Sequence, residues 1–130
     1  MSSQERKVVV AEGAPKAIGP YSFAIRAGNF IFASGTIGVD PTTGEFVAGG
    51  VEDQTRQALK NLAEVLMAGG SSLEKVVKTT VFMQDMTEFT LMNAVYAEFF
   101  PHESPARSTV EVAALPKGAA VEIEAIALAG

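Results

Sequence analysis

The chain has 130 residues, of which 48% are hydrophobic and 19% charged, and its 10 basic and 15 acidic residues give a formal net charge of −5. This composition is typical of a globular protein and excludes a disordered chain. No apolar run approaches the roughly 20 residues that a membrane-spanning helix needs, and there is no cysteine for a disulfide or thiolate site. We therefore expect residues 1–130 to form a single domain, located in the cytoplasm because the N-terminus lacks the layout of a secretory signal.

The N-terminal part is predicted to contain three strands. A β-branched run predicts the first strand at 7–11, and 22–26 and 30–34 predict two more that are joined by a tight turn. The segment 14–20 is bounded by proline and glycine and is typical of a connection. A second turn is expected at 40–44, where proline fixes one backbone angle and glycine ends the turn.

A long amphipathic helix is the best-marked element of the chain. Across 51–66, apolar residues recur every three or four positions, and the pair Gly69–Gly70 then ends the pattern. Ser71 and Glu74 have the spacing of a capping box, which predicts one helical turn before the next strand.

Three more strands and a second helix are predicted in the C-terminal part. The strands are expected at 76–83, 108–112 and 121–128, and the helix between Thr87 and Pro101. The apolar stripe of that helix consists of Phe89, Met92, Tyr96 and Phe99. The elements therefore follow in the order β-β-β-α-β-α-β-β, which indicates an α+β fold.

The predicted sheet has more apolar surface than two helices can cover. Two amphipathic helices pack on one face of a sheet, yet the strand at 121–128 alternates apolar residues with Glu122, Glu124 and the apolar Ile126. A large uncovered apolar face normally marks an interface. We therefore expect a homo-oligomer.

The inventory of reactive side chains is short. The single histidine, His102, lies in a predicted loop, where an exposed histidine without a chemical role is expected. The carboxylates show no calcium-loop spacing and the glycines form no phosphate-binding motif, so we expect neither a metal nor a cofactor. The basic residues are scattered along an acidic chain, which does not favour nucleic acid as a partner.

Arg107 and Glu122 are the first candidates for chemistry. Arg107 opens a strand behind the stiff Pro105–Ala106 approach, and its guanidinium suits capture of a carboxylate as well as an ordinary surface ion pair. If Val112 pairs with Val121 in a hairpin, Arg107 and Glu122 share one face of the sheet, with their Cα atoms about 13 Å apart. There Glu122 either activates a water molecule or belongs to a solvated sheet face.

Four other residues are weaker candidates. Tyr21 follows a Gly-Pro bend that fixes its hydroxyl group, although a packing role explains it equally well. Ser34–Gly35 ends a strand, where glycine allows a ligand to approach the backbone closely. Asn93 follows Met92 of the apolar stripe, so a buried structural hydrogen bond is an alternative to ligand binding.

Several short segments together carry a family resemblance. They are residues 17–21 (AIGPY), 34–35 (SG), 77–82 (VKTTVF), 93–96 (NAVY), 105–108 (PARS), 112–117 (VAALPK) and 121–127 (VEIEAIA). In these segments the chain resembles the Rid family, also called YjgF or reactive intermediate deaminase, and within it the RidA branch. The resemblance runs from about Ala14 to Ala127 without large insertions.

The resemblance implies a fold, an assembly and an activity. The fold would be chorismate-mutase-like, a mixed β-sheet with two helices on one face, and it would assemble as a homotrimer with a cleft at each subunit interface. The activity would be hydrolysis of reactive 2-imino acids, such as 2-iminobutanoate and 2-iminopropanoate, to 2-oxo acids and ammonia. These imines form from enamines that pyridoxal-phosphate enzymes such as threonine dehydratase release.

The resemblance also implies roles for individual residues. Arg107 matches the family arginine that holds the substrate carboxylate, and Glu122 matches the glutamate that positions or activates water. The positions that line the same cleft are Tyr21, Ser34, Gly35 and Asn93. Thr109 stands where many relatives have a cysteine, so water rather than a thiol must attack, and Thr109 is expected to line the cleft. Ser104 replaces a frequent aromatic residue, which predicts a different pocket rim.

Two other functions stay open. A sensing module would use Arg107 to bind 2-oxo acids without turnover. An RNA-cleaving translation inhibitor is an activity attributed to some family members, although the net charge of −5 weighs against it. A chaperone-like role of the trimer has no sequence feature behind it, and the sequence does not indicate which imino acid is preferred.

Overall fold

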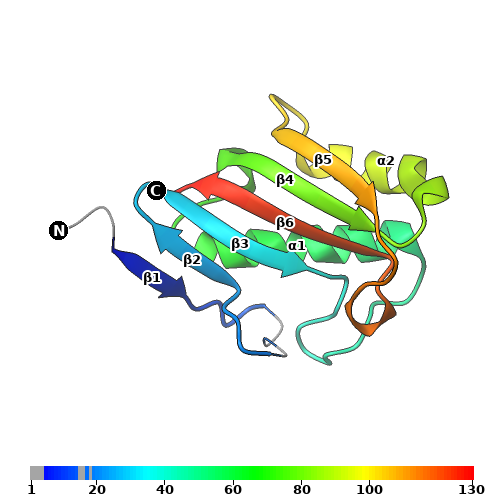
Figure 1. Ribbon diagram of the computed structural model, residues 1–130, viewed down its shortest axis with the longest axis horizontal. Helices are drawn as coiled ribbons and strands as arrows, with labels where there is room; N and C mark the ends of the chain where they lie inside the picture. The colour runs from blue at the N-terminus through cyan, green and yellow to red at the C-terminus, as the bar shows by residue number, and fades with distance from the viewer. Residues whose placement is uncertain (1–4, 15–16, 18) are drawn as a thin grey trace.

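Six strands form one mixed sheet in the computed structural model, which describes residues 5–14, 17 and 19–130 (Figure 1). The strands are β1 (Arg6–Val9), β2 (Ala24–Ala27), β3 (Phe30–Thr36), β4 (Val76–Met83), β5 (Ala106–Glu111) and β6 (Val121–Leu128). They lie across the sheet in the order β1-β2-β3-β6-β4-β5. β4 and β5 run parallel, and every other neighbouring pair is antiparallel.

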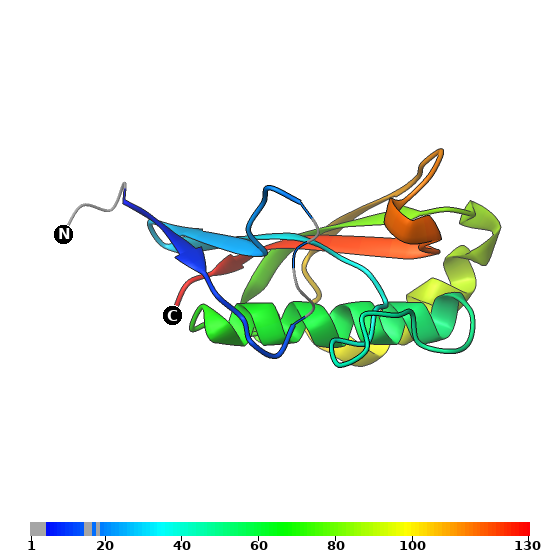
Figure 2. The ribbon, with the colours of Figure 1, turned by 90° about the horizontal axis from the view of Figure 1, so that it is seen from below.

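Two α-helices cover one face of the sheet and leave the other face open. They are α1 (Val51–Ala68) and α2 (Phe89–Phe99), and Figure 2 shows both on the same side. Short 3-10 turns precede β4, α2 and β6 at Leu73–Lys75, Met86–Glu88 and Pro116–Gly118. The expected α+β class, the order of the elements and the placement of both helices on one face are confirmed.

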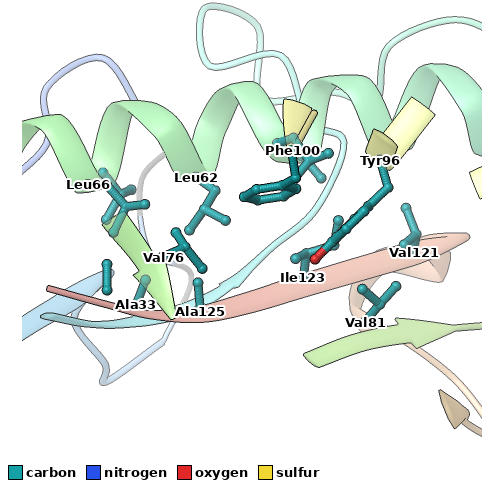
Figure 3. Close-up of a cluster of buried hydrophobic side chains, with 14 of the residues drawn as sticks. Ala33, Leu62, Leu66, Val76, Val81, Tyr96, Phe100, Val121, Ile123 and Ala125 are labelled. Atoms are coloured by element: carbon teal, nitrogen blue, oxygen red, sulfur yellow. The ribbon is translucent and has the colours of Figure 1, made fainter. Parts of the chain in front are cut away.

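The hydrophobic core lies between α1 and the central strands. Leu62 and Leu66 on α1 are fully buried, and so are Val121 and Ile123 on β6 (Figure 3). Fully burying one such side chain contributes about 1.5–3 kcal/mol, so this layer is a main source of stability. It also fixes the position of β6, and with it the backbone of Glu122.

The C-terminal end of α1 explains its two glycines. The N–H of Gly69 donates to the carbonyl oxygens of Leu66 and Val65 and caps the helix. A Cβ on Gly69 would lie 2.7 Å from Ile31 Cδ1, so the close packing of the helix end on β3 requires glycine. Gly70 has a φ of +83°, a conformation that glycine adopts at little cost.

The strands β5 and β6 do not form the expected hairpin. β4 lies between them and pairs with both, so Val112 and Val121 are not partners. Val112 instead donates its N–H to the carbonyl oxygen of Met83. The expectation was wrong because α2 supplies the long crossover that a parallel pair needs, which places β5 beside β4 at the edge of the sheet.

The second helix also begins later than the sequence suggests. The N–H and hydroxyl of Thr87 both donate to the Asp85 carboxylate, which fixes a 3-10 turn at Met86–Glu88. The α-helix proper therefore begins at Phe89. Thr87 belongs to the turn that leads into the helix and not to the helix itself.

Smaller differences concern the other ends of elements. The helical turn expected after Ser71 is present at Leu73–Lys75, but the capping box is wrong, since the Ser71 hydroxyl donates to the Leu128 carbonyl oxygen at 2.6 Å. The strands are present with their ends shifted by a few residues. The connection expected at 14–20 falls partly outside the described residues.

Apolar side chains stand exposed on the sheet face opposite the helices, which we call the open face. Phe30 and Phe32 on β3 are 40% and 46% exposed, and Leu128 on β6 is 45% exposed. Phe30 is the strand partner of Leu128, so these side chains form one continuous patch. The uncovered apolar face that the sequence predicts is thus present. In the part of the chain that the structure describes, no helix is long and apolar enough to cross a membrane.

Candidate functional site

A cavity of about 610 Å³ opens where β3 ends and β6 begins. Its volume is in the range of small-molecule sites. The sequence-predicted residues that line it are Tyr21, Ser34, Gly35 and Glu122. Further walls come from Phe23, the segment 36–44, Asn61 and the turn at Pro116–Lys117. The fold therefore brings together four of the seven predicted site residues.

A β-bulge brings Gly35 against Glu122. The register between β3 and β6 shifts between Ala33 and Thr36, which places Ser34 and Gly35 in the irregular stretch. A Cβ on Gly35 would lie 2.6 Å from the carboxyl carbon of Glu122. The close approach expected at this glycine is therefore made by a side chain of the protein itself, and a larger residue would displace that carboxyl group.

Glu122 is half-buried in the wall of the cavity. Desolvation raises the pKa of its carboxyl group above the ordinary value, and the nearby charge of Glu124 raises it further. A carboxylate with a raised pKa is a stronger base, and its proton affinity lies closer to that needed near neutral pH. Glu122 is therefore suited to accept a proton from a water molecule in the cavity.

Ser34 and Tyr21 hold and line the other side of the cavity. The Ser34 hydroxyl donates to the Ser22 carbonyl oxygen at 2.7 Å, and the Ser34 N–H donates to the Phe23 carbonyl oxygen at 2.7 Å. These two bonds fasten the segment that carries Tyr21 to β3. Tyr21 is 45% exposed and meets the Phe23 ring edge-on at 5.9 Å. Tyr21 thus presents its ring to the cavity, whereas the Ser34 hydroxyl is already used in its hydrogen bond to Ser22 within the cavity wall.

Arg107 lies in a second cluster, on the face that the helices cover. Its Nη1 donates to Asn93 Oδ1 at 2.8 Å. Its guanidinium carbon lies 4.7 Å from the centre of the Tyr96 ring and 5.4 Å from that of Phe89, within cation–π range. The structural hydrogen bond considered for Asn93 is therefore present, and its partner is Arg107.

Within one chain, Arg107 and Glu122 face opposite sides of the sheet. Arg107 is the strand partner of the buried Thr79 and contacts α2. Glu122 lies between Val121 and Ile123, which both point into the core, so strand alternation directs Glu122 to the open face. The expectation that the two residues share a face was wrong, because it depended on the β5–β6 hairpin.

Thr109 lies two residues after Arg107 and on the same face of β5. Its Oγ1 is buried, and within the described part of the chain it has no hydrogen-bond partner. A buried hydroxyl without a partner costs about 1–3 kcal/mol, so Thr109 offers an unused hydrogen-bonding group in this cluster. Ser104, the other departure from the family pattern, donates its hydroxyl to the Phe100 carbonyl oxygen.

Comparison with known proteins identifies the family. A family model described as Endoribonuclease L-PSP matches residues 11–129, which is nearly the whole chain. The chain belongs to the Rid family. The resemblance inferred from the short segments is thereby confirmed.

Members of the Rid family are close relatives in both sequence and structure. A RutC family protein of Pyrococcus horikoshii is 55% identical over 94% of this chain and 97% of its own. A mouse protein named 2-iminobutanoate/2-iminopropanoate deaminase is 50% identical over 100% of this chain and 95% of its own. The crystal structure of the YjgF gene product of E. coli matches with a TM-score of 0.88 and 48% identity, over 94% of this chain and 98% of that one.

The sequence interpretation of this Rid chain missed three residues that shape the site. Phe89 and Tyr96 were expected only as an apolar stripe, although with Asn93 between them at i+4 they lie on one helix face. The sequence did not show that Arg107 would lie opposite them. Lys117, which lines the cavity, donates from Nζ to the Gly44 carbonyl oxygen at 3.1 Å and so bridges two loops.

The side chains that could bind a metal ion are dispersed in the described part of this Rid chain. Across residues 5–14, 17 and 19–130, no three His, Cys, Asp or Glu side chains are grouped closely enough to hold an ion together. The groups available for chemistry at the two clusters include a guanidinium, a carboxyl group, the amine of Lys117, hydroxyls and an amide.

Proposed function

We propose that this Rid protein is a deaminase that hydrolyses 2-imino acids to 2-oxo acids and ammonia. The observation that carries the proposal is the Arg107 guanidinium, which Asn93 and two aromatic rings hold in place on the edge strand β5. Such a group is suited to pairing with a substrate carboxylate. The proposal is supported by the mouse relative, half of whose residues are identical and whose name states this activity.

In the proposed binding step, Arg107 pairs with the carboxylate of the imino acid. One N–H of Nη1 is used by Asn93, and a guanidinium has five such donors, so four remain, of which a bidentate contact uses two. This contact fixes the imine carbon relative to the protein. Orientation of this kind can lower a barrier by about 7–11 kcal/mol at its upper limit.

In the proposed chemical step, Glu122 accepts a proton from water as the water oxygen bonds to the imine carbon. The C=N double bond becomes a single bond, and the nitrogen takes up the proton that Glu122 has accepted, which gives a neutral carbinolamine. The carbinolamine hydroxyl then gives its proton to Glu122 as the C=O bond forms, the C–N bond breaks, and the nitrogen takes this proton from Glu122 and leaves as ammonia. The sum is one imino acid and one water converted to one 2-oxo acid and one ammonia. An imine carbon is electrophilic by itself, so this sequence requires no cofactor.

We also propose that the working unit is a homotrimer and that each site is completed by two subunits. Residues 1–130 would act as a single domain in it. One chain presents Arg107 on the covered face and Glu122 on the open face, so a neighbouring copy must supply one of the two. The open face, with Phe30 and Phe32 exposed, offers the apolar surface for such packing. We include a cytoplasmic location in the same proposal, because an unstable imine has to be hydrolysed in the compartment where the enzyme that forms it releases it.

The ribonuclease activity in the family's description finds less support in this chain. Polyanion binding needs clustered basic side chains, whereas the charged residues that line the cavity are Lys117 and Glu122, in a chain of net charge −5. A salt-dependent RNA-binding assay is expected to give no retention at physiological ionic strength. A sensing module would bind 2-oxo acids and would have no use for the basic carboxylate of Glu122.

The test is a coupled assay of imine hydrolysis. Threonine dehydratase generates 2-iminobutanoate, semicarbazide traps the imine that is not hydrolysed, and the release of 2-oxobutanoate is followed with and without the protein. We expect acceleration by the wild type and none by Arg107→Ala. Arg56→Ala is the matched control, because Arg56 makes an exposed ion pair with Glu98, and such pairs contribute little to stability. Equal rates with wild type and with no protein would overturn the proposal, and binding of 2-oxobutanoate without turnover would favour the sensor.

A further inference from the structure

The guanidinium of Arg107 rests against one face of α2. Phe89, Asn93 and Tyr96 stand at positions i, i+4 and i+7, so their side chains follow one another along the helix. Asn93 accepts a hydrogen bond from Arg107, and the two flanking aromatic rings lie within 5.4 Å of the guanidinium carbon. The arginine is therefore held by three side chains of a single rigid element.

Tyr96 is itself held firmly in this arrangement. It is 5% exposed, its hydroxyl is hydrogen-bonded with Thr79 Oγ1 at 2.8 Å, and its ring packs on Phe100 with the ring centres 4.7 Å apart. Thr79 is also the strand partner of Arg107. The same point of β4 thus fixes both the ring and the backbone of the arginine that the ring contacts (Figure 3 shows Tyr96 reaching from α2 towards the sheet).

We propose that Tyr96 and Phe89 are positioning residues that fix the Arg107 guanidinium for the substrate carboxylate. This inference rests on the proposed function, since it takes Arg107 as the carboxylate anchor. A free arginine side chain samples many rotamers and loses that freedom when it binds a ligand. The two rings and Asn93 remove the freedom before the ligand arrives, so binding is stronger. The rings do not touch the reacting atoms.

The competing explanation is that both rings only fill the core. Tyr96 belongs to the core cluster and Phe89 packs against it, so their loss lowers stability under either explanation. Only the positioning role predicts an effect on ligand binding that disappears when Arg107 is absent. Phe99 provides the matched control, because it lies on the same helix and packs against the same core cluster.

A spectroscopic experiment tests the contact without any ligand. The Arg107 Nε–H proton, assigned by its loss in Arg107→Lys, is expected to be shifted upfield by the ring currents in the NMR spectrum of the wild type. The shift should shrink in Tyr96→Leu and in Phe89→Leu, and it should persist in Tyr96→Phe, which keeps the ring and loses the Thr79 hydrogen bond. An unshifted wild-type signal, or a signal whose position in both Leu variants is the same as in the wild type, overturns the proposal.

Kinetic and binding measurements then test the role. In Tyr96→Leu we expect the KM for 2-iminobutanoate and the Kd for 2-oxobutanoate to rise roughly 5- to 30-fold, which corresponds to about 1–2 kcal/mol at 1.4 kcal/mol per tenfold. kcat should stay within about twofold, because the rings take no part in the chemical step. Tyr96→Phe should restore binding, and Phe99→Leu should leave it unchanged.

A double-mutant cycle with Arg107→Lys decides between positioning and core filling. If the rings act through Arg107, Tyr96→Leu should weaken binding by less than about twofold further in that background. An equal loss in both backgrounds, or a folded Tyr96→Leu with unchanged Kd, overturns the proposal. If Tyr96→Leu does not fold, the half-buried Phe89→Leu gives the same decision. A wild type that binds 2-oxobutanoate without turnover overturns the deaminase function alone, since the Kd series still tests positioning.

Discussion

The two charged residues of the proposed site lie in opposite kinds of environment. Arg107 is held by Asn93 and the rings of Phe89 and Tyr96. Glu122 is half-buried, and burial together with Glu124 makes its negative charge less favourable, so its pKa is raised. The first arrangement suits binding of an anion, and the second suits acceptance of a proton. Each residue is therefore expected to affect a different kinetic constant.

Glu122→Gln should lower kcat by roughly 100-fold or more, the usual contribution of a general base, while KM changes little. The wild-type kcat should rise with pH as Glu122 loses its proton, with a midpoint above the ordinary glutamate value of 4.5. The Gln variant should show no such rise. Steady-state kinetics from pH 4 to 8 measure kcat for the wild type and for the variant. This range of pH is chosen to include the titration of Glu122. A wild-type profile that is flat over this range would remove the role of Glu122 as the base.

The same raised pKa has a consequence for stability. Because folded Glu122 holds its proton more tightly than the unfolded chain does, the free energy of unfolding falls as pH rises from the unfolded pKa through the folded one. Glu122→Gln removes this contribution. The variant should therefore gain stability relative to the wild type on going from acid to neutral pH, as measured by urea unfolding. A stability difference that is independent of pH contradicts the raised pKa.

Gly35→Ala should disturb Glu122 more than it disturbs the fold. The added methyl group would overlap the Glu122 side chain, which can rotate aside at moderate cost. We expect a loss of kcat of about tenfold or more, since displacing a catalytic group is severe, with a change in Tm of only a few degrees. Gly50→Ala is the control, because a Cβ there meets no atom of the described residues within 4 Å. Full activity of Gly35→Ala would show that the position of the carboxyl group is not critical.

For single residues, the sequence predicted the kind of contact but not the partner that makes it. The need for glycine at position 35 was predictable, since a glycine that ends a strand signals a close approach, but the sequence did not identify Glu122 as the group approaching. Asn93 was predictable as a hydrogen-bonding residue, and its partner Arg107 was not. Partners across space depend on which strands are neighbours, and that information is not local.

At the scale of elements, α1 fastens the segments that carry the cavity. Asn61 is 1% exposed, and its Nδ2 donates to the carbonyl oxygens of Ile37 and Val39 at 3.0 and 2.9 Å. The Gln54 Oε1 accepts the N–H of Ala120, immediately before β6. One helix thus positions both the loop after β3 and the start of β6.

Asn61→Leu should destabilise the protein by roughly 1–3 kcal/mol, the cost of a buried polar group that loses its partner, because the buried bond to the Val39 carbonyl oxygen is lost, whereas the Ile37 carbonyl oxygen keeps the N–H of Val39 as a donor. Urea unfolding provides the measurement. Gln57→Ala is the comparison, since Gln57 only donates to Asn61 Oδ1 from a partly buried position and should cost about 0.5–1.5 kcal/mol. A loss for Asn61→Leu no larger than that for Gln57→Ala would show that the fastening contributes little.

Elements with a strong periodic pattern were predicted well, and the pairing of strands was not. The repeat of apolar residues and the closing glycines located α1 almost to the residue, since helices are stabilised by contacts close in sequence. β5 was recognised as a strand, but its neighbour was taken to be β6. A hairpin and a β-α-β crossover have the same strand pattern, and only the packing of α2 on the sheet distinguishes them.

At the scale of the whole molecule, the sheet has one face buried by helices and one open face with exposed apolar side chains. Phe32→Glu places a charge in the middle of the open face, beside its strand partner Ile126. We expect the proposed trimer to dissociate and imine hydrolysis to be lost with it, because desolvating an unpaired charge costs several kcal/mol. Sedimentation velocity measures the mass.

Met67→Glu is the matched control for this substitution. Met67 is 56% exposed and lies on α1, on the opposite side of the sheet from the open face. The same added charge at this position should leave the assembly and the activity intact. A wild type that sediments as a monomer, or a Phe32→Glu variant that stays trimeric, would contradict assembly through the open face.

The most direct test mixes two inactive variants. Arg107→Ala and Glu122→Gln subunits are unfolded together at equal amounts, refolded, and assayed for 2-oxobutanoate release. If every site takes Arg107 from one subunit and Glu122 from a neighbour, random mixing leaves about one quarter of the sites intact, so about a quarter of the wild-type activity should return. Each variant refolded alone is the baseline. If the mixture is no more active than its components, Arg107 and Glu122 do not meet across a subunit interface.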